Sequence, residues 1–258
     1  MYPYIKVFSI HIPTYGLCVC LAVILCAVLS FKKAKKMMVD TNDLLIVFAV
    51  SIGVGMFGGN LLYNLVTYDI KTLWGIIISG QISLLQKTGT VFYGGLIGGA
   101  FAAIITSKLL KMQIGKLEMC VVPYIPLGHA IGRIGCLLAG CCYGFPYHGI
   151  FAVSTKLYPG EGAFFPIQCV EAIFNLLITG VLLLYAKRRR RDFSITSLYI
   201  ILYSALRFFL EFFRGDDIRG NFYIFSTSQW ISLILFLISL IFYFTKCRAE
   251  AKEPMEEK

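Results

Sequence analysis

Long apolar stretches constrain this chain more than any other feature of its sequence. They recur from Tyr15 to Phe244, and each has about 18 residues or more, enough for an α-helix to cross a hydrocarbon core about 30 Å thick. The chain is 58% hydrophobic and only 15% charged, whereas soluble domains carry about 25% charged residues. No low-complexity linker divides it. We therefore predict an all-α, polytopic integral membrane protein with a single membrane domain over residues 1–258.

The apolar stretches predict about seven transmembrane helices and one long loop on the outer side. The helices are expected near residues 14–31, 43–66, 90–107, 119–139, 166–186, 194–213 and 226–244, with the loop at about 140–165. A shorter apolar segment, residues 73–85, is interrupted by Gly75, Gly80 and Gln81. We expect this segment to lie along the outer interface or to re-enter the membrane.

The positions of the basic residues predict the orientation. Of the 24 lysines and arginines, 16 follow the first, third, fifth and seventh stretches, and six lie at the opposite ends. Because basic residues concentrate in cytoplasmic loops, we expect the N-terminus outside and the C-terminus in the cytoplasm. The first stretch precedes its basic cluster, so we expect an anchor rather than a cleaved signal peptide. Basic clusters at helix ends also argue against nucleic acid as a partner.

Glycines recur inside two of the predicted helices. The third contains Gly94-x-x-x-Gly98 and Gly95-x-x-x-Gly99, a spacing that lets two helix backbones approach closely. The second carries a similar group between residues 53 and 59. Close helix packing is the favoured interpretation, and room for a lipid chain or headgroup is the alternative.

Three of the nine cysteines cluster at the outer end of the fourth predicted helix. Cys136, Cys141 and Cys142 have a C-x4-C-C spacing that matches no standard zinc pattern. Packing or an optional disulfide is therefore favoured over a metal site. A thiol-redox enzyme is disfavoured as well, because no C-x-x-C pair is present.

Two arginines lie inside predicted helices, where each costs about 2.5–3.5 kcal/mol. Glu211 follows Arg207 by four residues and shares its helix face, so the two are expected to form an ion pair, with Arg214 further along that face. Arg133 has no carboxylate within one helical turn. An unmatched guanidinium predicts an anion, and a lipid phosphate suits its bidentate geometry. Snorkelling of Arg133 to the interface is the alternative.

Several motifs in order along the chain resemble the prolipoprotein diacylglyceryl transferase family. They are Tyr15-Gly16-Leu17, Gly94-Gly95-Leu96-Ile97-Gly98, Gly132-Arg133-Ile134-Gly135 through Gly144, Pro166-Ile167-Gln168 with Glu171, Arg207 with Glu211-Phe212-Phe213-Arg214, and Ser228-Gln229-Trp230. Each motif alone is weak, but the ordered set covers most of the chain. The family's seven spans with the N-terminus outside agree with the charge count.

The resemblance implies a multi-pass enzyme of the bacterial plasma membrane. It would transfer the diacylglyceryl group of phosphatidylglycerol to the lipobox cysteine thiol in the signal-peptide segment of a prolipoprotein. A thioether forms and glycerol phosphate leaves, which is the first step of lipoprotein maturation. The substrate supplies the thiolate nucleophile, and neither a metal nor a soluble cofactor is implied.

The resemblance also implies the site residues. Arg133 and Arg207 fall on the family's essential arginines and would stabilise the departing phosphate, and Tyr93 joins them in the catalytic set. The positions implied for substrate binding are Tyr15, Gly94, Gly95, Gly132, Gly135, Gly144, Gln168, Glu171, Glu211 and Arg214.

The chain departs from the family pattern, so it resembles a divergent member. Tyr93 stands where the family has a histidine that is the usual candidate base, and tyrosine is a poor base at neutral pH. His129 or Glu211 could supply the base, or the thiol could ionise without one. Other family polar residues are replaced by Cys136, Ala139, Cys141 and Phe165.

Two further functions stay open at this point. A related transferase could use a phospholipid with a different acceptor. A lipid-binding or transport protein could use the same fold without catalysis, although the paired internal repeats typical of transporters are not evident.

Overall fold

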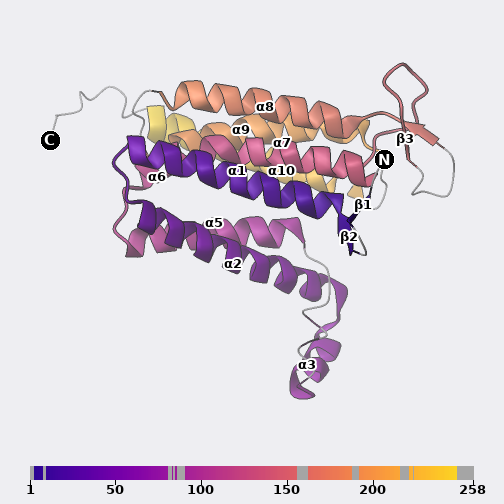
Figure 1. Cartoon of the computed structure of the whole chain (residues 1–258), viewed down its shortest axis with the longest axis horizontal. Coiled ribbons are helices and arrows are strands. Elements are labelled where there is room, and N and C mark those ends of the chain that lie inside the picture. Colours follow the sequence, from indigo (N-terminus) through magenta and orange to yellow (C-terminus); the bar gives the residue numbers. More distant parts are fainter. Residues whose placement is uncertain are drawn as a thin grey trace. The chain divides into compact units, whose positions relative to one another are not determined.

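The structure is a computed structural model that describes residues 3–7, 10–80, 83, 85, 91–155, 162–187, 192–215, 221–222 and 224–248. The helices are α1 (Thr14–Lys36), α2 (Thr41–Thr67), α3 (Ile70–Ile78), α5 (Phe92–Leu109), α6 (Ile114–Val121), α7 (Ile125–Ala139), α8 (Ile167–Tyr185), α9 (Ser194–Leu210) and α10 (Thr227–Phe242) (Figure 1). Shorter helical turns are η1 (Val122–Tyr124), η2 (Glu211–Phe213) and the π-helix η4 (Tyr243–Arg248).

Strands are few and short. They form three antiparallel pairs among the described residues: β1 (Tyr4–Val7) with β2 (Ile10–Pro13), β3 (Val153–Thr155) with β4 (Gly162–Phe164), and β5 (Asn221–Phe222) with β6 (Phe225–Ser226). Each pair lies just before α1, α8 or α10, so the strands belong to the connections and not to the core.

Six helical segments of the described chain are long and apolar enough to cross a membrane. They are Thr14–Lys36, Thr41–Thr67, Ile114–Ala139, Ile167–Tyr185, Ser194–Phe213 and Thr227–Thr245. Each overlaps a predicted span, which confirms a helical, multi-pass membrane protein. The prediction at 90–107 corresponds to α5, whose apolar part, Gly94–Leu109, is shorter. The number of spans and the orientation stay predictions.

Two sequence expectations need revision or stay open. The span expected at 119–139 begins earlier, at Ile114, and η1 interrupts it around Pro123, because proline lacks the backbone N–H that an α-helix needs. The segment at 73–85 contributes to α3, but its later part lies largely outside the described residues. Its place relative to the membrane stays a prediction.

The chain packs as two compact units. The first comprises Met1–Lys32 and Glu118–Lys258, and the second comprises Lys33–Leu117. A single membrane domain therefore stays a prediction.

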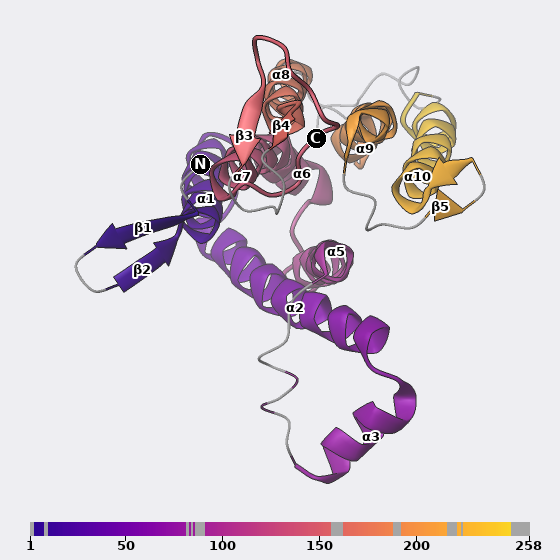
Figure 2. The same ribbon diagram turned by 90° about the vertical axis from the view of Figure 1, so that its right-hand side faces the viewer.

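Helices α7, α8, α9 and α10 form the body of the first unit, in which α7 packs on α8, α8 on α9 and α9 on α10 (Figure 2). Along α8, the polar residues lie on the buried face, together with apolar residues such as Ile178 and Leu182. Gln168, Glu171, Asn175 and Thr179 recur at helical spacing and are buried. Apolar residues such as Ile173 and Leu177 are exposed. This inside-out pattern is expected where lipid, and not water, surrounds the helices.

The start of α9 is held by a carboxylate from α6. Phe193 precedes the helix with φ at 64° and offers no capping side chain. Instead, Glu118 Oε2 accepts hydrogen bonds from the Thr196 amide (3.1 Å) and the Thr196 hydroxyl (2.7 Å). The first-turn amides of a helix need acceptors, so this bond anchors the helix that carries Arg207.

Glycines allow the backbones of α2 and α5 to touch in the second unit. A Cβ added at Gly58 would lie 2.6 Å from the Gly94 carbonyl oxygen, and one added at Gly98 would lie 3.0 Å from the Val54 carbonyl oxygen. Real Cβ atoms essentially never approach as closely as 2.6 Å, and a contact of 3.0 Å is tighter than most. Close helix packing, the favoured interpretation of these glycines, is therefore confirmed.

We expect Gly58→Ala to destabilise the second unit by about 1–3 kcal/mol, the usual cost of overpacking. Gly53→Ala is the matched control on the same helix, since a Cβ there meets nothing within 4 Å. Thermal unfolding of both variants in detergent measures the difference. Equal unfolding temperatures would show that the α2–α5 contact does not depend on these glycines.

Candidate functional site

Arg133 forms an ion pair with a carboxylate from the neighbouring helix. Its Nε atom on α7 lies 3.0 Å from Oε1 of Glu171 on α8, and the Glu171 side chain is 1% exposed. His129 Nε2, one turn earlier on α7, lies 3.6 Å from the same oxygen. The expectation that Arg133 lacks a carboxylate partner was therefore wrong. Spacing along one helix could not reveal a partner that tertiary packing supplies.

Arg207 pairs with Glu211 as its spacing predicted. Arg207 Nη2 lies 2.5 Å from Glu211 Oε2 across one turn, and the two side chains are 6% and 8% exposed. The Ser226 hydroxyl donates to Glu211 Oε1 at 3.0 Å. Ser226 also caps α10, where it accepts a hydrogen bond from the Gln229 amide. Glu211 thus ties the end of α9 to the start of α10.

Sequence reasoning missed Ser226 as a site residue. Its signal was present as a Ser-x-x-Gln capping box, Ser226 to Gln229, at the start of the last helix. That pattern predicts a helix start, but it says nothing of the second contact that the serine makes with Glu211.

The two ion pairs belong to one charged cluster. Arg207 interacts electrostatically with Glu171 as well as Glu211, and Arg214 also acts on Arg207. Among the described residues, three arginines and two carboxylates thus interact in this cluster. Arg207 Nη1 is buried and donates no hydrogen bond within the described part of the chain. The cluster is therefore built to accept an anion.

Tyr15 and two glycines surround Arg133. The Tyr15 side chain, in the first turn of α1, lies within electrostatic reach of Arg133. A Cβ at Gly135 would lie 2.8 Å from Cys18 Cβ, so this glycine lets α1 approach α7. A Cβ at Gly132 would meet nothing within 4 Å. Packing among the described residues therefore does not require Gly132.

Gly144 brings the loop after α7 into contact with two helix ends. A Cβ there would lie 2.7 Å from the Phe165 carbonyl oxygen and 2.9 Å from that of Phe213. Gly144 also forms a β-bridge with Arg214. This close approach holds the backbone of Arg214 beside the loop. Gln168 adds a further tie, because its Nε2 donates to the Cys141 carbonyl at 2.7 Å.

The cysteines of this loop converge on one point. The sulfurs of Cys136, Cys141 and Cys142 all lie within 4.8 Å of one another, and Arg133 and Arg214 act electrostatically on Cys142. No disulfide forms between cysteines in the described ranges. The three thiols therefore adjoin the charged cluster, which their C-x4-C-C spacing did not reveal.

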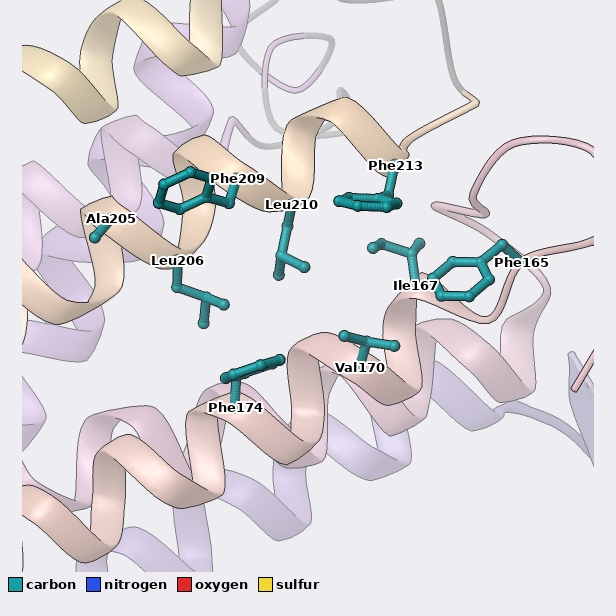
Figure 3. A pocket seen from close by; sticks show the side chains of 9 residues that line it. All are labelled: Phe165, Ile167, Val170, Phe174, Ala205, Leu206, Phe209, Leu210 and Phe213. Atoms are coloured by element: carbon teal, nitrogen blue, oxygen red, sulfur yellow. The ribbon is translucent and has the colours of Figure 1, made fainter.

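An apolar groove runs between α8 and α9. It has a volume of about 470 Å³, and side chains from the two helices point toward one another across it (Figure 3). Its lining residues are all apolar: Phe165, Ile167, Val170, Phe174, Ala205, Leu206, Phe209, Leu210 and Phe213. The groove opens outward, since Phe174 and Phe209 are 45% and 64% exposed. Glu171 and Arg207 directly follow two of the lining residues in sequence.

Three of the predicted site residues belong to the second unit, whereas the arginine cluster belongs to the first. Gly94 and Gly95 face α2, where each contacts a glycine carbonyl of that helix. Tyr93 is in the first turn of α5, and its side chain lies outside what the structure describes. Their roles in catalysis and substrate binding stay predictions.

Comparison with known proteins gives a consistent result. The family model for prolipoprotein diacylglyceryl transferase matches residues 3–245. A phosphatidylglycerol–prolipoprotein diacylglyceryl transferase of Clostridium tetani is 34% identical over 92% of this chain and 94% of its own length. A second such transferase, numbered 2, of Clostridium perfringens is 32% identical over 92% of both chains, and one from Dehalococcoides mccartyi is 31% identical over 94% and 92%. The chain therefore belongs to the prolipoprotein diacylglyceryl transferase family.

Proposed function

We propose that this chain transfers the diacylglyceryl group of phosphatidylglycerol to the lipobox cysteine of a prolipoprotein, in the bacterial plasma membrane. Two nearly buried arginines, Arg133 and Arg207, are the observation that carries this proposal. Arg207 Nη1 donates no hydrogen bond within the described part of the chain, and phosphatidylglycerol brings a negative phosphate that could accept one. The names of the relatives support the same pair of substrates.

The reaction requires one bond to form and one to break. The thiolate sulfur of the acceptor attacks the diacylglyceryl carbon attached to the phosphate oxygen, and a carbon–sulfur bond forms. The carbon–oxygen bond breaks, and its electron pair goes to the phosphate oxygen of the departing glycerol phosphate. Stabilising this charge lowers the barrier, and preorganised donors in a water-poor site do so most effectively.

Arg133 and Arg207 would bind the phosphate, and the two glutamates would hold them in place. An arginine can present two parallel N–H donors to phosphate oxygens while another side of its guanidinium faces a carboxylate. Glu171 contacts Arg133 through Nε (3.0 Å), an arrangement that leaves the terminal nitrogens for a second partner. Glu211 holds Arg207 through Nη2, which leaves Nη1 for the phosphate. Arg214 would add positive charge beside Arg207.

Seven spans with the N-terminus outside and the C-terminus in the cytoplasm form part of this proposal. The start of α1, the loop after α7 and the end of α9 all lie at one end of the first unit (Figure 1). The arginine cluster is near that end, which the charge distribution assigns to the outer side. There it would meet the outer leaflet and the lipobox of an exported precursor.

The groove between α8 and α9 would receive one acyl chain of the lipid. A diacylglyceryl group must keep its chains in apolar surroundings while its headgroup reaches buried arginines. The groove offers only apolar side chains and opens outward next to the helix positions of Glu171 and Arg207. A lipid could thus enter from the side with its phosphate leading.

We expect Arg133→Lys to lower transfer by about 10²–10³-fold, because an ammonium cannot reproduce the bidentate contact. Arg248→Lys, in η4 beyond α10, is the conservative control and should keep activity. Purified variants are assayed with phosphatidylglycerol and a lipobox peptide, and each gene is tested in a host depleted of its own transferase. Unimpaired transfer by Arg133→Lys would contradict the role of Arg133. Failure of the well-expressed wild-type chain in both assays would overturn the proposed function.

We expect Ala205→Phe to raise KM for phosphatidylglycerol about tenfold with little change in kcat. The added ring fills the groove and displaces about two methylenes of an acyl chain, each worth about 0.8 kcal/mol. Ile173→Phe places the same ring on an exposed part of α8 outside the groove and serves as the control. Equal KM values for the two variants would rule out the groove as the acyl site.

A further inference from the structure

The three clustered thiols have the geometry of a metal site. Cys136, Cys141 and Cys142 offer sulfurs that all lie within 4.8 Å of one another. Around a tetrahedral zinc ion with Zn–S bonds of about 2.3 Å, sulfurs are about 3.8 Å apart. The three sulfurs therefore lie close to the spacing that such a site requires.

The backbone of the loop holds these cysteines together. Gly140 ends α7 in the left-handed conformation with φ at 77°, and the Cys141 amide then donates back to the Cys136 carbonyl at 3.1 Å. Cys142 itself has φ at 58°, which a residue with a side chain adopts at a cost of about 1–2 kcal/mol. Such strain persists where surrounding contacts enforce it and is typical of functional sites. Here Gln168 fixes the Cys141 carbonyl at 2.7 Å.

The surrounding charge suits an anionic thiolate complex. Three thiolates around a divalent cation carry a net charge of −1, and a fourth thiolate makes it −2. Arg133 and Arg214 both act electrostatically on Cys142, so the nearest charged side chains to this thiol with a known influence on it are positive.

The site would have one open coordination position. The group of potential ligand side chains identified among the described residues comprises these three cysteines and no fourth member. Structural zinc sites are closed by four protein ligands, whereas catalytic zinc sites use three and leave the fourth position to water or substrate. A thiol would be a suitable fourth ligand, because zinc binds cysteine sulfur.

We propose that Cys136, Cys141 and Cys142 bind a zinc ion and that the acceptor cysteine of the prolipoprotein joins as the fourth ligand. This inference rests on the proposed function. A free thiol has a pKa near 8.5 and is mostly protonated at neutral pH, whereas a coordinating thiol is deprotonated outright. Its proton leaves to solvent when the sulfur binds. The sulfur then attacks the diacylglyceryl carbon, while zinc keeps its charge and no oxidant is needed.

This arrangement places the nucleophile beside the electrophile. The cysteines that would hold the acceptor sulfur lie within electrostatic reach of Arg133, the residue proposed to hold the phosphate. It also removes the need for a protein base. His129 is already engaged close to Glu171 and the arginines, at 3.6 Å from the carboxylate.

Cobalt(II) titration of the full-length protein in detergent, under reducing and anaerobic conditions, tests the site directly. We expect one Co²⁺ per chain with the intense sulfur-to-cobalt absorption of a three-thiolate site. A lipobox peptide with its cysteine should increase this absorption, and the same peptide with serine should not. Cys136→Ser and, separately, Cys142→Ser should weaken Co²⁺ binding at least tenfold. Cys169→Ser, on α8 outside the cluster, should leave it unchanged.

Each outcome bears on a different claim. Absence of thiolate–cobalt absorption in the wild-type protein, folded by circular dichroism, would overturn the metal site. Co²⁺ binding without a response to the cysteine peptide would overturn the role in activating the acceptor. Zinc removal should lower the rate of transfer about 10²-fold or more, because assistance with the removal of a proton usually raises a rate by at least that factor. A cobalt site that forms as expected in a protein that never transfers diacylglyceryl groups would instead overturn the proposed function.

Discussion

The ion pair between Arg133 on α7 and Glu171 on α8 is the interaction on which the first unit depends. Both side chains are nearly buried, and Glu171 is 1% exposed. In apolar surroundings, removing one partner leaves a buried charge that costs about 3–5 kcal/mol. The pair therefore fixes the register of α7 against α8. Because α8 turns its polar residues inward, the same helix face brings Glu171 near Arg207.

The cluster built on this pair combines a fixed position with an unused donor. Glu171 and Glu211 orient Arg133 and Arg207, and Arg207 Nη1, which donates no hydrogen bond among the described residues, could bind an anion of the substrate. The loop after α7 then adds its thiols on the side of Arg133 and Arg214. The proposed phosphate site, the proposed nucleophile and the apolar groove thus lie among α7, α8 and α9.

Sequence reasoning predicted the helices well because long apolar runs have few alternatives to crossing a membrane. It also predicted the Arg207–Glu211 pair, since both residues lie on one helix face. It did not find the partner of Arg133, which comes from another helix. The sequence did not predict the cysteine cluster for a similar reason. Its sulfurs come together because Gly140 and Cys142 adopt left-handed backbone conformations, and the spacing of the cysteines in the sequence does not indicate that turn.

Binding of phosphatidylglycerol to the arginine cluster is the central claim, and native mass spectrometry of the detergent-purified protein measures it without turnover. Wild-type protein is compared with Arg207→Gln, which removes one positive charge and the guanidinium donors of the cluster. We expect phosphatidylglycerol to bind at least tenfold more weakly to the variant, whereas zwitterionic phosphatidylcholine binds both proteins equally. Equal binding of phosphatidylglycerol to the two folded proteins would contradict the claim that the buried arginines hold its phosphate.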